Sequence, residues 1–193
     1  KAYESSTDTA QFIEHHRLIL PEIVRVTKPG SSICWQVGYH VRDNVTTPLD
    51  FLVYEIMRSF KDVVLRNRIV WTFGHGLHSS KRLSGRHETL LWFTKGEGYT
   101  FALDAIRVPQ KYPGKRHYKG DKKGQYSGNP LGKNPGDVWD IPNVKANHIE
   151  KTNHPCQFPV ALAQRAIAAF TNKDDIVFDP YFGSGTTPAA AAL

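Results

Sequence analysis

Residues 175 to 193, DIVFDPYFGSGTTPAAAAL, constrain the fold of this chain more than any other stretch. The short apolar run that ends at Asp179 predicts a buried strand, Gly183 and Gly185 predict a tight turn, and the alanines that follow predict a helix. Glycines let a ligand approach the backbone, and the first turn of a helix directs its amides at that ligand. This order is typical of nucleotide-type cofactor sites, although an isolated copy is equally compatible with a plain turn.

Two familiar phosphate-binding motifs do not fit this turn. Gly183 and Gly185 are too close together for a P-loop, and no lysine follows the second glycine. Pro188 stands where G-x-G-x-x-G requires its third glycine. The turn therefore needs support from the rest of the chain.

Helical and strand patterns alternate along the sequence. Apolar residues three or four apart predict a helix over 12–26, which Pro21 kinks or restarts. A short apolar run bounded by turn residues predicts a buried strand over 31–37. A second helix is predicted over 49–60, with Thr47 as its cap, Pro48 at its first position and Asp50 completing a capping box. Strands over 63–73 and 88–95, a third helix over 160–170 and a buried strand over 176–180 follow. The alternation predicts an α/β fold with a mixed, mostly parallel sheet and helices on both faces.

Positive charge is concentrated in the middle of the chain. The 193 residues carry a formal net charge of +7, and most of the residues from Arg107 to Lys133 that bear charge are basic. Tyrosines and glycines between them predict flexible loops that follow a phosphate backbone, with a solvated surface loop as the alternative. Lysines are expected to position DNA, whereas arginine and asparagine have the geometry to contact base edges. The predicted DNA-binding residues are Lys81, Arg82, Arg107, Lys111, Lys115, Arg116, Lys119, Lys122, Lys123, Asn129, Lys133 and Asn134.

Two segments together carry a resemblance to a known family. HPCQFPVALAQRAIAAF at 154–170, followed by DDIVFDPYFGSGTT, resembles the paired cofactor-binding segments of the beta-group DNA amino-methyltransferases of restriction-modification systems. The resemblance implies that these segments hold S-adenosylmethionine. The matching positions are His154, Pro155, Phe158, Pro159, Asp179, Pro180, Phe182, Gly183, Ser184, Gly185 and Thr186. Phe182 departs from the family's commoner alanine and narrows the turn.

The resemblance also implies an order of parts. LPEIVRVTKPGSSICWQVG, RNRIVWTFGHG and HETLLWFTKGE are similar to the family's helix and strands after its catalytic motif. The implied fold is a circularly permuted, Rossmann-like S-adenosylmethionine-dependent methyltransferase. Its expected parts are a catalytic-half subdomain over 1–95, an inserted target-recognition region over 96–152 and the cofactor-binding half over 153–193. The motif (Asp, Asn or Ser)-Pro-Pro-(Tyr or Phe) is expected just before Lys1, so no catalytic residue is assigned here. We expect a fragment truncated at both ends that does not methylate DNA alone.

The implied activity is methyl transfer from S-adenosylmethionine to the exocyclic amine of a flipped base, adenine N6 in preference to cytosine N4. The alternatives are an inactive DNA-binding module on the same fold and an RNA methyltransferase. Double-stranded DNA is the expected partner, with a cognate restriction endonuclease and a homodimer as further candidates.

The remaining composition predicts a cytoplasmic protein with no membrane partner. No apolar run approaches the length of a membrane span, and the N-terminus lacks the apolar core of a signal peptide. Two distant cysteines suggest neither a disulfide framework nor a thiolate zinc site, and His75 with His78 is too small a set for a metal site. We therefore expect no metal.

Overall fold

The fold is built around a four-stranded mixed sheet. A computed structural model describes residues 8–76 and 78–193. The strands lie in the order β1-β5-β4-β6, with bounds β1 Ser32–Val37, β4 Val63–Thr72, β5 His87–Lys95 and β6 Val138–Asp140. Strand β5 is antiparallel to both β1 and β4, and β6 is parallel to β4.

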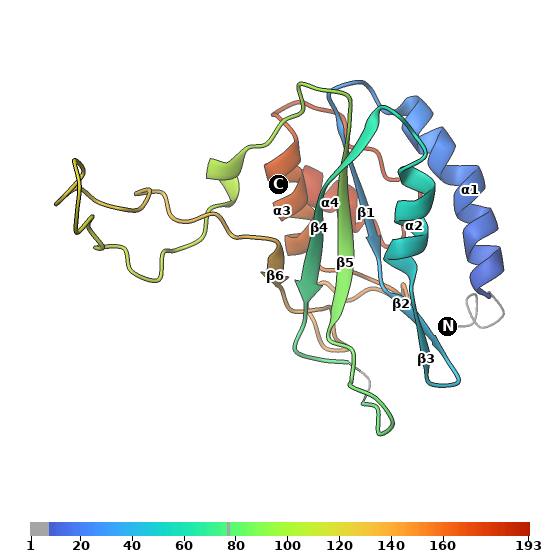
Figure 1. The fold of residues 1–193 in the computed structure, drawn as a ribbon. Helices are drawn as coiled ribbons and strands as arrows, with labels where there is room; N and C mark the ends of the chain where they lie inside the picture. The colour runs from blue at the N-terminus through green and yellow to red at the C-terminus, as the bar shows by residue number, and fades with distance from the viewer. Residues whose placement is uncertain (1–7, 77) are drawn as a thin grey trace.

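Helices cover both faces of this sheet, as the sequence predicts. Figure 1 shows α1 (Thr9–Val26) and α2 (Leu49–Met57) on one side, and α3 (Val160–Phe170) with α4 (Thr186–Ala191) on the other. Each side has its own hydrophobic cluster of buried residues. The α/β class with a mixed sheet is therefore confirmed.

A bulge in β4 lets this strand contribute side chains to the hydrophobic clusters on both faces of the sheet. The pairing register between β4 and β5 shifts between Leu65 and Asn67. Before the shift Val63 belongs to the cluster under α1 and α2, whereas after it Ile69 and Trp71 belong to the cluster under α3. Successive side chains of a strand point to opposite faces, so one extra residue exchanges the faces of all that follow. The bulge thereby turns the apolar side chains at the end of β4 toward α3.

Helix α1 begins at a capping box and continues through its proline. Asp8 accepts a hydrogen bond from the Gln11 backbone amide at 2.8 Å, and the Gln11 side chain accepts one from the Asp8 amide at 3.4 Å. Pro21 lies inside the helix, which is assigned as one element of 18 residues. The helix therefore does not restart at Pro21, and the alternative, a kink at Pro21, stays a prediction.

Helix α2 begins differently from the sequence prediction. Its N-cap is Pro48, which makes no side-chain cap, and Thr47 belongs to a strand. Asp50 is 3% exposed and accepts a 2.6 Å hydrogen bond from Nε of Arg68 on β4. A buried carboxylate needs a partner, and Asp50 finds it in Arg68. The carboxylate that would complete a capping box is therefore used in an ion pair.

A hairpin and a 3-10 helix complete the body. Strands β2 (Tyr39–Arg42) and β3 (Val45–Pro48) form a separate two-stranded sheet, joined by Asp43 and Asn44 with φ values of 50° and 63°. Two consecutive positive φ values characterise the tight turn that closes such hairpins. The 3-10 helix η1 (Leu103–Ile106) contributes Ile106 to the cluster under α3.

Residues 107–137 leave the body as a long excursion, which we call the arm. Figure 1 shows the arm extending away from the sheet between η1 and β6. Backbone bridges pair Val108 with Lys133 at its base and Arg116 with Tyr126 near its tip. The arm is therefore a loosely paired ribbon with little buried surface of its own.

Two strand predictions need correction. Most of the strand pairs in the described sheet are antiparallel, because β4 and β5 follow each other without a crossover helix. Residues 176–180 form no strand among the described residues, and Ile176 and Phe178 are 87% and 64% exposed. A strand requires a neighbour to pair with, and no described segment pairs with this one.

The division of the chain at 95 and 152 stays a prediction. Within the middle part, η1 and β6 pack into the body and the arm lies outside it. Cys34 and Cys156 are free and exposed. Across residues 8–76 and 78–193, no helix combines the length and apolar character needed to cross a membrane.

Because His16 is buried, we expect the free energy of unfolding to decrease in mild acid. His16 is 7% exposed, its ring stacks on Phe12 at 3.8 Å, and Nδ1 donates to the Phe12 carbonyl at 2.8 Å. Burial lowers the pKa of His16 below 6.5, with the Phe12 hydrogen bond opposing and the nearby His15 adding to the shift. Because the unfolded chain binds the proton more readily, the free energy of unfolding should fall as the pH drops below 6.5. Urea unfolding at pH 7.5 and 5.5 should show a smaller difference for His16→Asn than for the wild type. Equal differences would contradict this assignment.

Candidate functional site

The glycine turn between 179 and 186 is organised by one carboxylate. Oδ1 of Asp179 accepts hydrogen bonds from the amides of Tyr181 and Phe182 at 3.0 and 3.1 Å, and Oδ2 accepts one from Thr187 Oγ1 at 2.6 Å. Gly183 and Gly185 have φ values of +56° and +77°, a region that favours glycine. Asp179 therefore fixes the turn in which these glycines lie.

The segment containing His154 lies directly against this turn. A Cβ built on Gly183 would lie 3.4 Å from Nε2 of His154, so the backbone here faces the imidazole ring. Thr186 Oγ1 donates to the Phe158 carbonyl at 3.4 Å and lies 2.8 Å from Ser184 Oγ. The structure thus brings together the two segments that the sequence pairs as one site.

The remaining predicted cofactor residues lie around this contact. Pro159 is buried and is the N-cap of α3, while Pro155 and Pro180 are exposed. The Phe182 ring is 61% exposed and lies 3.4 Å from where a Cβ on Gly185 would stand. Phe182 therefore lines the turn on the side of Gly185.

Tyr181 attaches the turn to the opposite helical layer. Its ring lies 5.7 Å from that of Trp35 on β1 and 6.2 Å from that of His15 on α1. His16 packs edge-on against Trp35 at 5.7 Å. These ring contacts tie the glycine turn to the first strand and first helix.

Glu150 supports the His154 segment from the other side. Its Oε2 accepts a 2.9 Å hydrogen bond from the Val160 amide in the first turn of α3, whose own N-cap residue offers no side-chain bond. Gln157 donates to the Glu150 carbonyl at 2.6 Å and accepts from the Thr152 amide at 3.0 Å. Glu150 is thus a capping carboxylate that lies ten residues before the amide it caps.

The predicted DNA-binding residues divide into two structural classes. The lysines of the arm at 111, 115, 119, 122, 123 and 133 are exposed. Arg107 instead bonds Asp104 at 2.6 Å and the Gly132 carbonyl at 3.0 Å, and its side chain is 14% exposed. Arg107 therefore anchors the base of the arm.

Three further candidates for base contact also have local partners. Arg116 donates to the Gly124 carbonyl at 2.6 Å and lies over the Tyr126 ring at 4.0 Å. Asn129 and Asn134 each accept from the amide two residues ahead at 2.8 Å. These contacts shape the arm, and the role of the residues in binding DNA stays a prediction.

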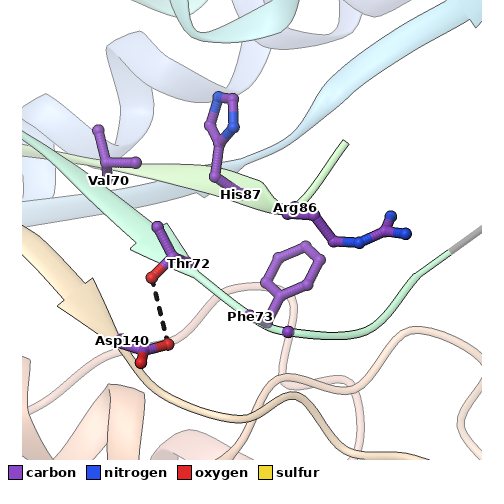
Figure 2. A pocket seen from close by; sticks show the side chains of 7 residues that line it. Val70, Thr72, Phe73, Arg86, His87 and Asp140 are labelled. Atoms are coloured by element: carbon purple, nitrogen blue, oxygen red, sulfur yellow. Dashed lines mark hydrogen bonds between the residues drawn. The ribbon is translucent and has the colours of Figure 1, made fainter. Parts of the chain in front are cut away.

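Three polar side chains form a row at one end of the sheet. Thr72 at the end of β4 pairs with His87 on β5 and with Asp140 on β6. Thr72 Oγ1 donates to Asp140 Oδ1 at 3.3 Å (Figure 2). Trp71 and Trp139 alternate with these residues and belong to the cluster under α3, so the row lies on the opposite face.

This row lines a shallow hollow of about 470 Å³ that is widely open to solvent. Val70, Phe73, Gly74 and Arg86 complete its lining. Figure 2 shows that these side chains come from β4 and the residues after it, from the start of β5, and from β6. The hollow therefore sits where β4 and β6 both end.

The loop over 73–86 borders this hollow and carries Lys81 and Arg82. Arg82 donates to the Leu83 carbonyl at 3.1 Å, and Lys81 is exposed. Asn143 donates to the His75 carbonyl at 3.3 Å, which joins the loop to the segment after β6. Within the described ranges, no cluster of three or more His, Cys, Asp or Glu is placed to hold a metal ion.

Sequence reasoning missed Asp140, Thr72 and Glu150. The β-branched and aromatic residues of VWDI at 138–141 are a short strand signal, and they stand in a segment otherwise rich in proline and glycine. No local pattern marks Glu150, because its partner amide lies ten residues away.

Comparisons with known proteins agree on one family. A family model described as DNA methylase matches residues 1–193. The type II methyltransferase M.BglII of Bacillus subtilis is 51% identical over 182 residues, which cover 94% of this chain and 50% of that protein. This chain therefore spans half the length of that relative.

Solved structures share the fold. The cytosine-N4-specific PvuII DNA methyltransferase superposes with a TM-score of 0.74 at 19% identity, covering 97% of this chain and 64% of that one. The M1.HpyAVI–SAM complex superposes with a TM-score of 0.59 at 19% identity, covering 96% and 72%. Both likenesses concern the fold.

The cap on α3 predicts a measurable stability difference. Glu150→Ala removes the acceptor of the Val160 amide and should lower the free energy of unfolding by about 1 kcal/mol, as loss of a helix cap does. Glu150→Gln retains a side-chain oxygen and should lose less. Glu55→Ala, which removes an exposed pair with Arg58, is the control and should have little effect. Equal losses in urea unfolding for Glu150→Ala and Glu55→Ala would refute the cap.

Proposed function

This chain belongs to the DNA methylase family of N6 and N4 amino-methyltransferases, and we propose that the intact protein methylates DNA at a specific sequence. The acceptor is the exocyclic amine of adenine or cytosine, and the methyl donor is S-adenosylmethionine. The observation that carries this proposal is the close approach of the Gly183 backbone to the His154 imidazole. That approach brings together the two segments whose resemblance to the family implies cofactor binding, and this supports the proposal.

The turn presents open backbone beside His154. Gly183 has no side chain, and a Cβ there would fill the space next to the His154 ring, while the positive φ values of Gly183 and Gly185 favour glycine at both positions. Asp179 holds the turn through three hydrogen bonds, and Thr186 joins it to Phe158. The M1.HpyAVI methyltransferase, which shares this fold, was solved as a complex with SAM, and this supports the choice of donor.

The reaction depends on the alignment of the methyl donor with the amine that accepts the methyl group. The donor supplies an electrophilic methyl on sulfur, and the amine of a nucleobase attacks it in line. The turn at 183–186 and the His154 segment bind and orient the donor. The target base must leave the DNA stack to reach the methyl group.

The identity of the target base requires its own measurement. The preference for adenine N6 rests on how common that activity is in the family, and none of the side chains described above distinguishes the two amines. Mass spectrometry of nucleosides from methylated duplex DNA separates N6-methyladenine from N4-methylcytosine. Parallel reactions with RNA test the alternative substrate.

The arm is proposed to hold the DNA. Its exposed lysines lie along an extended ribbon beside the body (Figure 1), where they neutralise phosphates without contacting bases. Lys81 and Arg82, which follow β4 in the chain, are proposed to add phosphate contacts. We further propose a cytoplasmic location, a cognate restriction endonuclease as a genetic partner and a homodimer as a candidate assembly.

Donor binding should depend on the absence of a side chain at Gly183. Gly183→Ala in the intact protein places a methyl group 3.4 Å from Nε2 of His154. The affinity for S-adenosylmethionine in calorimetry should fall by about ten-fold or more, equivalent to about 1.4 kcal/mol. Gly98→Ala is the matched control, because Gly98 has a φ of +78° and no atom within 4 Å of an added Cβ. Equal affinities for the two variants would contradict this cofactor site.

The salt dependence of DNA binding tests the arm. Lys115, Lys122 and Lys123 are changed together to glutamine, which leaves the structural Arg116 in place. The slope of log K against log salt should become shallower by about 2 to 3, since each phosphate contact contributes about 0.9. Lys28, Lys61 and Lys173 are exposed lysines outside the arm, and the same three changes there are the control. Slopes that match in the two triple variants would assign the arm lysines to ordinary surface.

A further inference from the structure

The hollow at the ends of β4 and β6 is lined by polar side chains that have no part in the proposed cofactor site. His87, Thr72 and Asp140 occupy one row across β5, β4 and β6. The Thr72 hydroxyl lies 3.3 Å from Asp140 Oδ1 and 3.4 Å from the Trp139 carbonyl, so it shares one proton between two acceptors of β6. The Asp140 carboxylate is thus a hydrogen-bond acceptor that stands beside β4 at the end of the sheet.

The row lies where both predicted DNA-binding segments join the sheet. The arm returns to the body through Lys133 and Asn134 and continues into β6, which ends at Asp140. The loop over 73–86 joins Thr72 to His87 and carries Lys81 and Arg82. Both predicted DNA-binding segments are thus continuous in the chain with the strand ends that line the hollow.

A carboxylate in this position is unfavourable for binding phosphates. The chain carries a net charge of +7, and the arm that leads into β6 is strongly basic. Asp140 is exposed and would repel a phosphate brought against it. It contributes to DNA binding only if it accepts a hydrogen bond, and the donors that DNA offers in its major groove are the amines of cytosine N4 and adenine N6.

We propose that Asp140 recognises one base pair of the recognition sequence by accepting a hydrogen bond from a base amine. This inference rests on the proposed DNA methylation and deepens it by naming a specificity-determining residue. His87 lines the same hollow and its ring carries an N–H donor, whereas the Arg86 guanidinium donates to the Gly85 carbonyl at 2.7 Å. In both kinds of base pair an amine lies beside acceptor atoms in the major groove, so an acceptor next to a donor matches that edge. Phe73 supplies the apolar wall.

The test compares discrimination at each position of the recognition sequence. The sequence methylated by the intact wild-type protein is first determined, and kcat/KM is then measured on duplexes that each differ from it at one base pair. Asp140→Asn keeps the shape of the side chain but adds donors. It should lose discrimination at one position by roughly ten- to a hundred-fold and keep it at all others. Thr72→Val, which removes the hydroxyl beside Asp140, should weaken discrimination at the same position by a smaller factor.

Asp62→Asn is the matched control. Asp62 is exposed, immediately precedes β4, and lies outside both the arm and the lining of the hollow. It should leave discrimination unchanged at every position. If Asp140→Asn discriminates as the wild type does at all positions, the base contact is refuted while DNA methylation stands. If the wild type transfers no methyl group to any duplex, the proposed function fails and this inference fails with it.

Discussion

The close approach of the Gly183 backbone to the His154 ring is the constraint on which the candidate cofactor site depends. The chain leaves His154, runs through α3 along the sheet and returns to the glycine turn, so α3 sets the relation of the two segments. Helix α3 is held in place by Phe170, whose ring stacks on Trp92 of β5 at 4.1 Å, and by the buried Leu162. Packing in the hydrophobic cluster under α3 therefore determines the geometry of the glycine turn.

The bulge in β4 connects this packing to the DNA-binding side. By exchanging the faces of the strand after Leu65, it turns Ile69 and Trp71 toward α3 and leaves Thr72 on the opposite face. The Trp71 indole then donates to the Ile141 carbonyl at 2.7 Å, which fixes the segment just beyond β6. One irregularity in one strand thus sets both the support of the cofactor turn and the row that contains Asp140.

The parts of the fold that the sequence predicts are those with local signals. The apolar periodicity of 160–170 and the continuous apolar run within 88–95 specify their own structure, and the two cofactor segments are recognisable by their residues. Features that depend on a distant partner were not predictable. Asp50 has the spacing of a capping box but pairs with Arg68, and residues 176–180 have the composition of a buried strand but lie exposed. In the same way, Glu150 and Asp140 acquire their roles from residues that lie near them only in the folded chain.

The most direct test of the cofactor site is a crystal structure of the intact protein with S-adenosylhomocysteine, the product of methyl transfer. The ligand should lie against the backbone of residues 183–186, with the His154 ring and Phe158 beside it. A ligand bound elsewhere, with the Gly183 backbone still facing His154 and no ligand atom in contact with the turn, would contradict the central claim.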